Sequence, residues 1–356
     1  MSIEVASSRG PRWRARLGRM LKRLVAVAAI GLLALWIYAA TFAPEREDWD
    51  GQRALLANRV VQPLPVQPDR ERLLADVREL SSAQYAGRGV DTAGGRLAAD
   101  YLVGRLRDLG IEPLVPDYRQ PFVFQRKRIR QFWTGGIETR GVNLLGVIRG
   151  RTRPDAYLVI SAHYDHLGVR DGVIYPGADD NASGVATLLA AAAQFKAHPP
   201  AHSLVFALFD GEETGIAGAR HFVDSGVLPM ASVRLNLNFD MLSRSSDGVL
   251  FATGTWQHPE LKTLVDPLRA QAPVRVLYGH DQPRPFWDAD DWVHASDHGR
   301  FHDAGVPFLY LGVPDHADYH RPGDTFAAID TDFFVDAAAF ALSLIAAADA
   351  AAPAQP

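Results

Sequence analysis

The longest uncharged apolar run of the chain lies near its N-terminus. Residues 24–43 (LVAVAAIGLLALWIYAATFA) contain no charged side chain, and a helix rising about 1.5 Å per residue would let them cross a hydrocarbon layer of about 30 Å. Residues 1–23 carry seven arginines and lysines, from Arg9 to Arg23, and such a basic flank stays on the cytoplasmic side. We therefore expect a single-pass helix in an inner membrane, with the rest of the chain in the periplasm or on the extracellular side.

A cleaved signal peptide is the alternative interpretation of this segment. Small residues between Ala39 and Ala43 resemble a cleavage site, but the apolar stretch is longer than the core of an ordinary signal peptide. Pro44 directly follows the best candidate position and disfavours cleavage there. A retained anchor is the favoured interpretation, and a secreted form stays open.

Behind the anchor, the pattern divides the chain into a linker, a folded domain and a short tail. Residues 44–67 are polar and rich in proline, which indicates a linker. Apolar positions spaced by three and four residues predict a helix over 69–82, and a glycine-rich loop leads into a second amphipathic helix that ends at Gly110. We expect residues 68–350 to form the folded domain and residues 351–356 to be disordered.

From residue 155 onward, strand-like and helix-like segments alternate. Four apolar runs predict strands, and they cover residues 156–162, 203–210, 233–240 and 307–312. Helical patterns follow at 183–197 and 332–350. This alternation is typical of a doubly wound α/β fold, a mostly parallel sheet flanked by helices, in which ligands bind beyond the carboxyl ends of the strands.

Acidic and imidazole side chains gather at the carboxyl ends of three of these predicted strands. They are His163 and Asp165 after the first strand, Asp210, Glu212 and Glu213 after the second, and Asp240 after the third. Carboxylates crowded at one edge of a sheet repel one another strongly unless a cation neutralises them. The pattern therefore predicts a cation site at this edge.

The composition narrows the kind of cation site. The sequence has no cysteine, so a metal must be bound by His, Asp and Glu, which suit zinc. Asp179 and Asp180 precede a predicted helix, and His316, Tyr319 and His320 stand near the C-terminus. Each of these short patterns alone has an ordinary structural explanation, such as helix capping by an aspartate. Together they favour zinc or a similar divalent ion, and a shared carboxylate would allow two metals about 3.5–4 Å apart.

Six segments carry a resemblance to a known family. They are AHYDHLG at 162–168, GADDNASG at 177–184, FDGEETG at 209–215, LNFDM at 237–241, SDHGRF at 296–301 and DYHRPGDT at 318–325. In this order they resemble the M28 zinc metallopeptidases, a family that includes bacterial secreted aminopeptidases. The similarity runs from about Leu74 to the end of the last predicted helix. It implies a zinc aminopeptidase fold and a hydrolase that acts on peptide bonds with two zinc ions per chain.

The resemblance also implies the ligands of the two metals. His163 and Asp240 would bind one zinc, and Glu213 and His320 would bind the other. Asp180 would bridge the pair. The peptide bond after Asp180 would be cis, although the next residue is not proline.

Further residues would act around the metals. Glu212 would be the general base for the attacking water, and Asp165 would orient His163, because a ligating histidine usually donates its other N–H to a carboxylate. Tyr319 or His298 would stabilise the developing oxyanion, or Tyr319 would serve only to pack the site. Residues expected to support the site without binding metal are Asp165, His166, Asp297, His298 and Tyr319.

Two segments bear on the shape of the domain and its pocket. Many relatives carry an inserted domain before the first metal motif, whereas only Val115–Gly141 separates the corresponding parts here. We therefore expect one compact catalytic unit. The acidic and aromatic segment Trp287–Trp292 is either a surface loop or a pocket wall that binds a free amino terminus.

The favoured function is a membrane-anchored di-zinc aminopeptidase with a peptide substrate. The alternative is a glutaminyl cyclase, a single-zinc aminoacyltransferase on the same fold, and the presence of both His163 and Asp240 favours the hydrolase. A non-catalytic binding domain would have lost ligands or the base, and the sequence retains them all. The formal net charge of −4 disfavours nucleic-acid binding. Carboxypeptidase and dipeptidase activities stay open.

Overall fold

The chain divides into two units. The computed structural model describes residues 12–41, 47–126, 136–283 and 290–351. The smaller unit comprises residues 1–47 and 282–290, and the larger unit comprises residues 48–281 and 291–356.

The smaller unit contains the N-terminal helix α1 (Arg12–Thr41). Its segment Met20–Tyr38 is long and apolar enough to cross a membrane, and the protein buries none of it. Ala43 and Pro44, on which the cleavage question depends, lie outside the described residues. A second helix passes the same test of length and composition, α9 (Thr331–Ala350), but 67% of it is buried, as expected for a core helix.

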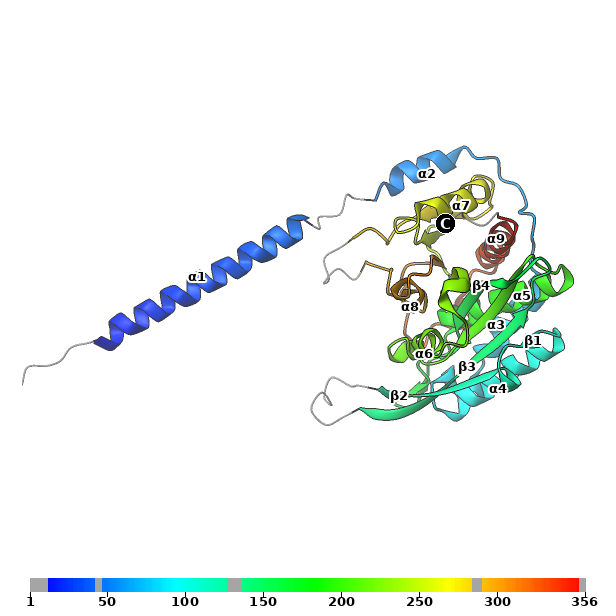
Figure 1. Ribbon diagram of the computed structural model, residues 1–356, viewed down its shortest axis with the longest axis horizontal. Helices are drawn as coiled ribbons and strands as arrows, with labels where there is room; N and C mark the ends of the chain where they lie inside the picture. Colours follow the sequence, from blue (N-terminus) through cyan, green and yellow to red (C-terminus); the bar gives the residue numbers. More distant parts are fainter. Residues whose placement is uncertain (1–11, 42–46, 127–135, 284–289, 352–356) are drawn as a thin grey trace, which may run out of the picture. The chain divides into compact units, whose positions relative to one another are not determined.

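A nine-stranded sheet forms the centre of the larger unit (Figure 1). Its strands are β1 (Glu112–Pro113), β2 (Arg119–Arg126), β3 (Ile137–Ile148), β4 (Arg153–His163), β7 (His202–Phe209), β8 (Val233–Phe239), β9 (Val249–Thr253), β10 (Arg275–Tyr278) and β11 (Phe308–Gly312). The order is β1-β3-β7-β4-β8-β11-β9-β10, with β2 also paired to β3. The central strands β7, β4, β8 and β11 are parallel to one another, and β3, β9 and β10 run against them. The predicted mostly parallel sheet is confirmed.

Helices cover both faces of this sheet. They are α3 (Arg70–Leu80), α4 (Ala93–Asp108), α5 (Gly184–Ala197), α7 (Lys262–Arg269) and α9 in one core, and α6 (Ala217–Asp224) and α8 (His298–Asp303) in the other. Strand β7 contributes side chains to both cores. Leu204, Phe206 and Leu208 belong to the first core, and the alternate residues Val205, Ala207 and Phe209 belong to the second, because successive side chains of a strand point to opposite faces. The unbroken apolar run of β7 therefore reflects burial on both sides.

The predicted linker over 44–67 is wrong for most of its length. Helix α2 (Trp49–Ala57) lies within it, capped by the Asp48 side chain, which accepts the Gly51 N–H. Leu56 packs in a small apolar cluster with β9 and β10 residues, and Leu64 and Val66 belong to the main core. Proline and polar residues dominate the composition of this segment, so the few buried apolar positions give no visible periodicity.

The segment Val115–Gly141 is too short for a domain and contributes β2 and the start of β3. Strands β2 and β3 pair from Arg119 with Leu144 to Arg126 with Ile137. Residues 127–135, which connect them, lie outside the described residues. The short strands β5 (Val169–Arg170) and β6 (Val173–Ile174) form a separate two-stranded hairpin.

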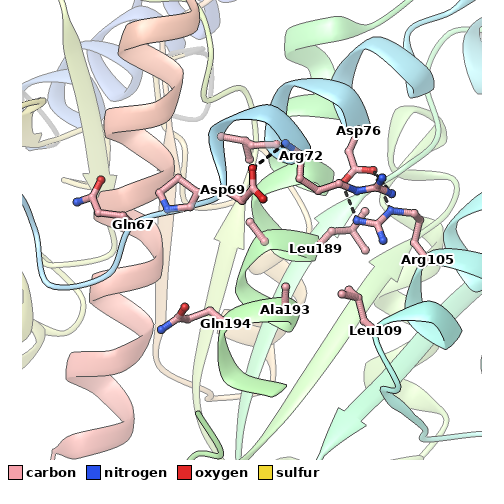
Figure 2. A pocket seen from close by; sticks show the side chains of 12 residues that line it. Gln67, Asp69, Arg72, Asp76, Arg105, Leu109, Leu189, Ala193 and Gln194 are labelled. Carbon is pink, nitrogen blue, oxygen red and sulfur yellow. Dashed lines mark hydrogen bonds and ion pairs between the residues drawn. The ribbon is translucent and has the colours of Figure 1, made fainter. Parts of the chain in front are cut away.

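A buried ion pair joins α3 to α4 (Figure 2). Arg105 donates from Nε and Nη2 to the two carboxylate oxygens of Asp76, both at 2.9 Å. Tyr101 donates its hydroxyl to the same carboxylate at 2.5 Å. Asp76 and Arg105 border a cavity of about 440 Å³ among α3, α4 and α5. Since every strong partner of Asp76 comes from these two helices, the cluster has a structural role in holding them together.

Candidate metal centre

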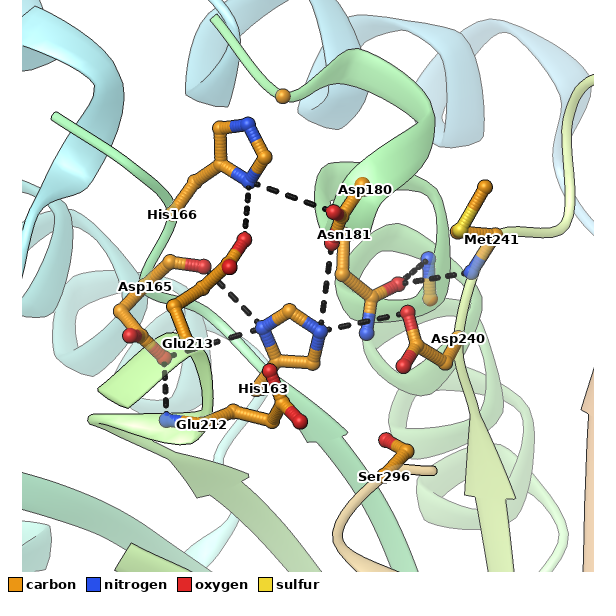
Figure 3. A network of polar contacts seen from close by, with 12 residues as sticks. His163, Asp165, His166, Asp180, Asn181, Glu212, Glu213, Asp240, Met241 and Ser296 are labelled. Atoms are coloured by element: carbon orange, nitrogen blue, oxygen red, sulfur yellow. Dashed lines mark hydrogen bonds and ion pairs between the residues drawn. The ribbon is translucent and has the colours of Figure 1, made fainter. Parts of the chain in front are cut away.

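The residues at the carboxyl ends of three neighbouring strands lie close together at one edge of the sheet. His163 is the last residue of β4, Asp240 directly follows β8, and Glu212 and Glu213 follow β7 in a short helical turn. These strands are adjacent in the order β7-β4-β8 and parallel, so their carboxyl ends meet at the same edge. Figure 3 shows these side chains converging on His163.

Asp180 reaches the same place from a tight turn before α5. The turn Ala178–Ser183 is fully buried and contains a cis peptide bond between Asp180 and Asn181, which confirms the cis bond expected from the family resemblance. The Asp324 carboxylate accepts the backbone N–H groups of Asp179 and Asp180, at 2.9 and 3.0 Å. Asn181 donates its side-chain amide to the Phe239 carbonyl at 2.9 Å. The turn is thereby tied to β8, next to Asp240.

The first group of potential ligands is His163, Asp180 and Asp240. His163 Nε2 lies 3.4 Å from Asp180 Oδ1 and 3.3 Å from Asp240 Oδ1. All three residues are buried, and their ligand atoms lie within 4.8 Å of one another. Ligand atoms about 2.0–2.1 Å from a tetrahedral zinc are separated by roughly 3.3–3.4 Å. The spacing of this group matches zinc.

The second group lies on the other side of Asp180. His320 Nε2 is 3.2 Å from Asp180 Oδ2 and 3.1 Å from Glu213 Oε2. His166 Nδ1 is 2.7 Å from Glu213 Oε1 and 3.6 Å from Asp180 Oδ2. The two carboxylate oxygens of Asp180 therefore face different groups, as a bridging carboxylate would.

The polar atoms of the first group need a cation between them. The Asp165 carbonyl can only accept, so His163 donates to it from Nδ1, at 3.1 Å. In the neutral ring, Nε2 then presents its lone pair to two carboxylates. Burial alone lowers the pKa of His163, but the charges of Asp240, Glu212 and Asp180 outweigh it and raise that pKa well above the ordinary value. A proton or a metal ion must occupy the space beside Nε2, and the donor set suits zinc.

Asp165 acts through two different atoms. Its backbone carbonyl accepts from His163, whereas its carboxylate oxygen Oδ1 is 3.8 Å from His163 Nδ1. That oxygen accepts the backbone N–H of Glu212 at 3.1 Å. The Asp165 carboxylate thus holds the turn that carries Glu212 and also lies within ion-pair distance of His163, while the shorter contact to His163 comes from the Asp165 carbonyl. Burial raises the pKa of Glu212 well above its ordinary value.

A small cavity of about 70 Å³ opens beside the two groups. Its lining includes Glu212, Asp240, Trp292, Tyr310, Asp315 and Tyr319. The Tyr319 ring stacks on His320 with 3.9 Å between ring centroids. Of the segment Trp287–Trp292, Trp292 belongs to the cavity wall, and Trp287 lies outside the described residues.

Asp297 and His298 lie behind the cavity rather than in its wall. His298 Nε2 donates to the Trp292 carbonyl at 2.7 Å, and its ring packs on Phe308 and Tyr310. Burial raises the pKa of Asp297 to about 7. Of the two residues expected to face an oxyanion, Tyr319 lines the cavity and His298 is not among the described lining residues.

Arg88 holds the backbone beside the Asp180 turn and was not predicted from the sequence motifs. Its guanidinium is buried and donates only to backbone carbonyls among the described residues, those of Leu80, Tyr164, Pro176 and Gly177, at 2.5–2.9 Å. Two of these carbonyls immediately precede the turn that carries Asp180. A signal was present, because Arg88 stands between two glycines in the glycine-rich loop before the second predicted helix.

Asp324 and Tyr310 were also missed. Asp324 orients the Asp180 turn, and the Tyr310 hydroxyl donates to the Asp240 carbonyl at 3.2 Å. Asp324 belongs to the quoted segment DYHRPGDT, so the sequence contained a signal for it. Tyr310 sits inside an apolar strand and carried none.

Comparison with known proteins gives one curated relative and two solved structures of particular relevance. Aminopeptidase YwaD of Bacillus subtilis is 31% identical over 214 residues, which cover 53% of this chain and 41% of that protein. The chain spans less than half the length of the curated relatives YwaD and a probable zinc metalloprotease of Pyrenophora tritici-repentis.

Both solved structures share the fold at low identity. An aminopeptidase from Aneurinibacillus sp. strain AM-1 has a TM-score of 0.63 at 15% identity, over 78% of this chain and 93% of that chain. The glutaminyl cyclase of Porphyromonas gingivalis has a TM-score of 0.61 at 15% identity, over 78% and 98%. The profile of Peptidase family M28 matches residues 143–345, which include every residue of the two ligand groups. The chain belongs to peptidase family M28.

Proposed function

We propose that this protein is a membrane-anchored, zinc-dependent exopeptidase, an aminopeptidase that binds two zinc ions per chain. The observation that carries the proposal is the pair of ligand groups that share Asp180, with Glu212 beside them in the cavity wall. His163 and Asp240 would hold one zinc, and Glu213 and His320 the other. Membership of peptidase family M28 and the similarity to aminopeptidase YwaD support zinc and peptide chemistry.

The residues around the cavity have complementary tasks in hydrolysis. Bound zinc would polarise the scissile carbonyl and make a nearby water more acidic. Glu212 would accept a proton from that water and pass it to the leaving amine. Asp165 keeps Glu212 in reach, because its carboxylate holds the Glu212 backbone N–H. Tyr319 would donate a hydrogen bond to the oxygen that gains negative charge.

The cavity favours attack next to a free amino terminus. Its volume of about 70 Å³ leaves room for one end of a peptide rather than for a chain passing through. Asp315 borders it and is exposed to solvent, where a carboxylate can attract a protonated amine. Small N-terminal side chains should therefore be preferred.

Helix α1 would anchor the protein in the membrane. Met20–Tyr38 would span an inner membrane, with the basic N-terminal flank in the cytoplasm and the larger unit in the periplasm or outside. Release by signal cleavage is the alternative.

The test uses the full chain purified in detergent. Zinc is measured by elemental analysis, and release of N-terminal residues is measured on a peptide panel. We expect two zinc ions per chain, and we expect Glu212→Gln to lower kcat by about 100- to 10,000-fold with the zinc content unchanged. Glu260→Gln, at an exposed glutamate outside the cavity, is the matched control and should retain activity.

A glutaminyl cyclase is the second candidate, because the Porphyromonas gingivalis enzyme shares the fold. The same panel contains peptides with N-terminal glutamine. One zinc per chain, no hydrolysis and conversion of that glutamine to pyroglutamate would replace the aminopeptidase proposal with the cyclase.

A further inference from the structure

His166 is buried in the second ligand group although it was expected only to support the site. Its side chain has no exposed surface. Nδ1 points at Glu213 and Asp180 (Figure 3), at 2.7 and 3.6 Å from their nearest carboxylate oxygens. His166, Asp180 and Glu213 form a set whose ligand atoms all lie within 4.8 Å of one another.

The contact between His166 and Glu213 does not have the geometry of a hydrogen bond. Both ring nitrogens of His166 and Glu213 Oε1 are buried without a hydrogen-bond partner among the described residues, despite the 2.7 Å approach. Leaving such polar atoms unsatisfied costs about 1–3 kcal/mol each. Two buried ligand atoms that approach each other without a hydrogen bond can share a cation. Their 2.7 Å separation is shorter than the roughly 3.3–3.4 Å between ligands of a tetrahedral zinc, so they must move apart by about 0.6 Å when they share it.

The fold holds the His166 ring in this position. Gly177 has a positive φ of 61°, and a Cβ there would lie 2.6 Å from His166 Cγ. The ring also meets His320 edge-on, with 5.8 Å between the ring centroids. The ring is therefore packed against a bare glycine on one side and against a predicted zinc ligand on the other, which fixes the direction of Nδ1.

We propose that His166 is a fourth protein ligand of the metal that Asp180, Glu213 and His320 hold. This inference rests on the proposed function, because it assumes the two-metal centre. A fourth ligand would give the two metals different numbers of protein ligands. The metal bound by His166 has four protein ligands, whereas the metal bound by His163, Asp180 and Asp240 has three and keeps an open position for substrate, as catalytic zinc does. The metal with four protein ligands should bind more tightly and should be the last to be removed by a chelator.

The test measures metal binding and not activity. The full chain in detergent is stripped with a chelator and titrated with Zn²⁺ against a chromophoric competitor. Wild-type protein should show one tight and one weaker site. His166→Ala and His166→Gln should each weaken the tight site by about 100-fold and leave the weaker site within about threefold. His163→Gln should weaken the other site instead.

Two further results separate a ligand from a hydrogen-bond donor. The amide of His166→Gln can still donate to Glu213, so recovery of wild-type affinity in this variant would overturn the proposal. X-ray absorption of the wild-type protein loaded with zinc should find three histidines shared between two metals, and two would overturn it without any variant. His316→Gln, at a histidine that pairs with Asp179 outside both groups, is the matched control and should bind metal as the wild type does.

Failure of this inference can be told apart from failure of the proposed function. Two metals of unequal affinity without release of N-terminal residues would keep His166 as a ligand and remove the aminopeptidase. If the wild type hydrolyses peptides and both His166 variants bind metal as the wild type does, the aminopeptidase proposal stands and His166 is not a ligand.

Discussion

His298 makes stability depend on pH in a direction that can be measured. Burial lowers its pKa to about 4, whereas an unfolded histidine titrates near 6.5. Below pH 6.5 the unfolded chain therefore binds a proton that the folded chain does not. The free energy of unfolding should fall as the pH drops from about 6.5 to about 4, by about 3 kcal/mol from this residue.

The measurement is urea unfolding of metal-free full-length protein between pH 4 and 7. His298→Gln keeps a donor for the Trp292 carbonyl and does not titrate, so its stability should vary less with pH than that of the wild type. His294→Gln is the control, because His294 is exposed and pairs with Asp303 at the surface. Equal pH slopes for wild type and His298→Gln would show that His298 does not cause the effect.

At the scale of single residues, the sequence predicts which residues belong to the site more readily than which atom of each residue makes the contact. His163, Asp240 and Glu212 were found because each stands at the end of an apolar run, and a run can be read from single letters. The sequence could not predict which atom of Asp165 faces His163, because this depends on rotations of the backbone and the side chain. The direction of His166 Nδ1 depends on Gly177, eleven residues away in sequence, which no local pattern connects to it.

Among the secondary-structure elements, the start of α5 couples the metal turn to the sheet. A Cβ at Gly184 would lie 2.3 Å from Asn181 Oδ1 and 2.4 Å from the Phe239 carbonyl oxygen. Both atoms belong to the contacts that hold the Asp180 turn against β8. Gly184→Ala should therefore destabilise the protein by about 1–3 kcal/mol and weaken binding of both metals, because Asp180 serves both groups.

Gly104→Ala is the matched substitution within α4. Nothing lies within 4 Å of a Cβ at Gly104, and alanine is favoured over glycine inside a helix by about 0.5–1 kcal/mol. Thermal unfolding should therefore place Gly104→Ala above the wild type and Gly184→Ala below it. If the two variants had the same stability, close packing would not be the reason for glycine at the start of α5.

The predicted elements are those with strong periodicity or continuous apolar runs. Strands β4, β7, β8 and β11 and helices α3, α4, α5 and α9 all lie where the pattern placed them. Strands β9 and β10, of five and four residues, carried too weak a pattern to be predicted, although β11, also of five residues, was predicted. Helix α2 was missed for a related reason, since only Leu56 is buried in its nine residues.

At the scale of the whole molecule, the corrected position of residues 48–67 changes where the folded domain begins. Leu56, Leu64 and Val66 are at most 8% exposed, and burying each side chain contributes about 1.5–3 kcal/mol. Arg59 also donates hydrogen bonds to the carbonyls of Ala272 and Pro273, at 3.1 and 2.9 Å. Together these contacts are worth about 5 kcal/mol or more, which is comparable with the entire stability of many domains.

Two truncations should therefore behave differently. A chain of residues 48–356 should leave the membrane fraction and unfold in urea at the same midpoint as the full chain in detergent, because α1 belongs to the other unit. A chain of residues 68–356 should be unfolded or aggregated. Leu56→Ala should cost about 2–5 kcal/mol, whereas Leu55→Ala, at a neighbouring leucine that is 79% exposed, should stay within about 0.5 kcal/mol of wild type. If residues 68–356 proved as stable as 48–356, the segment would be a linker after all, and the contacts of Leu56 and Arg59 would contribute nothing to the domain.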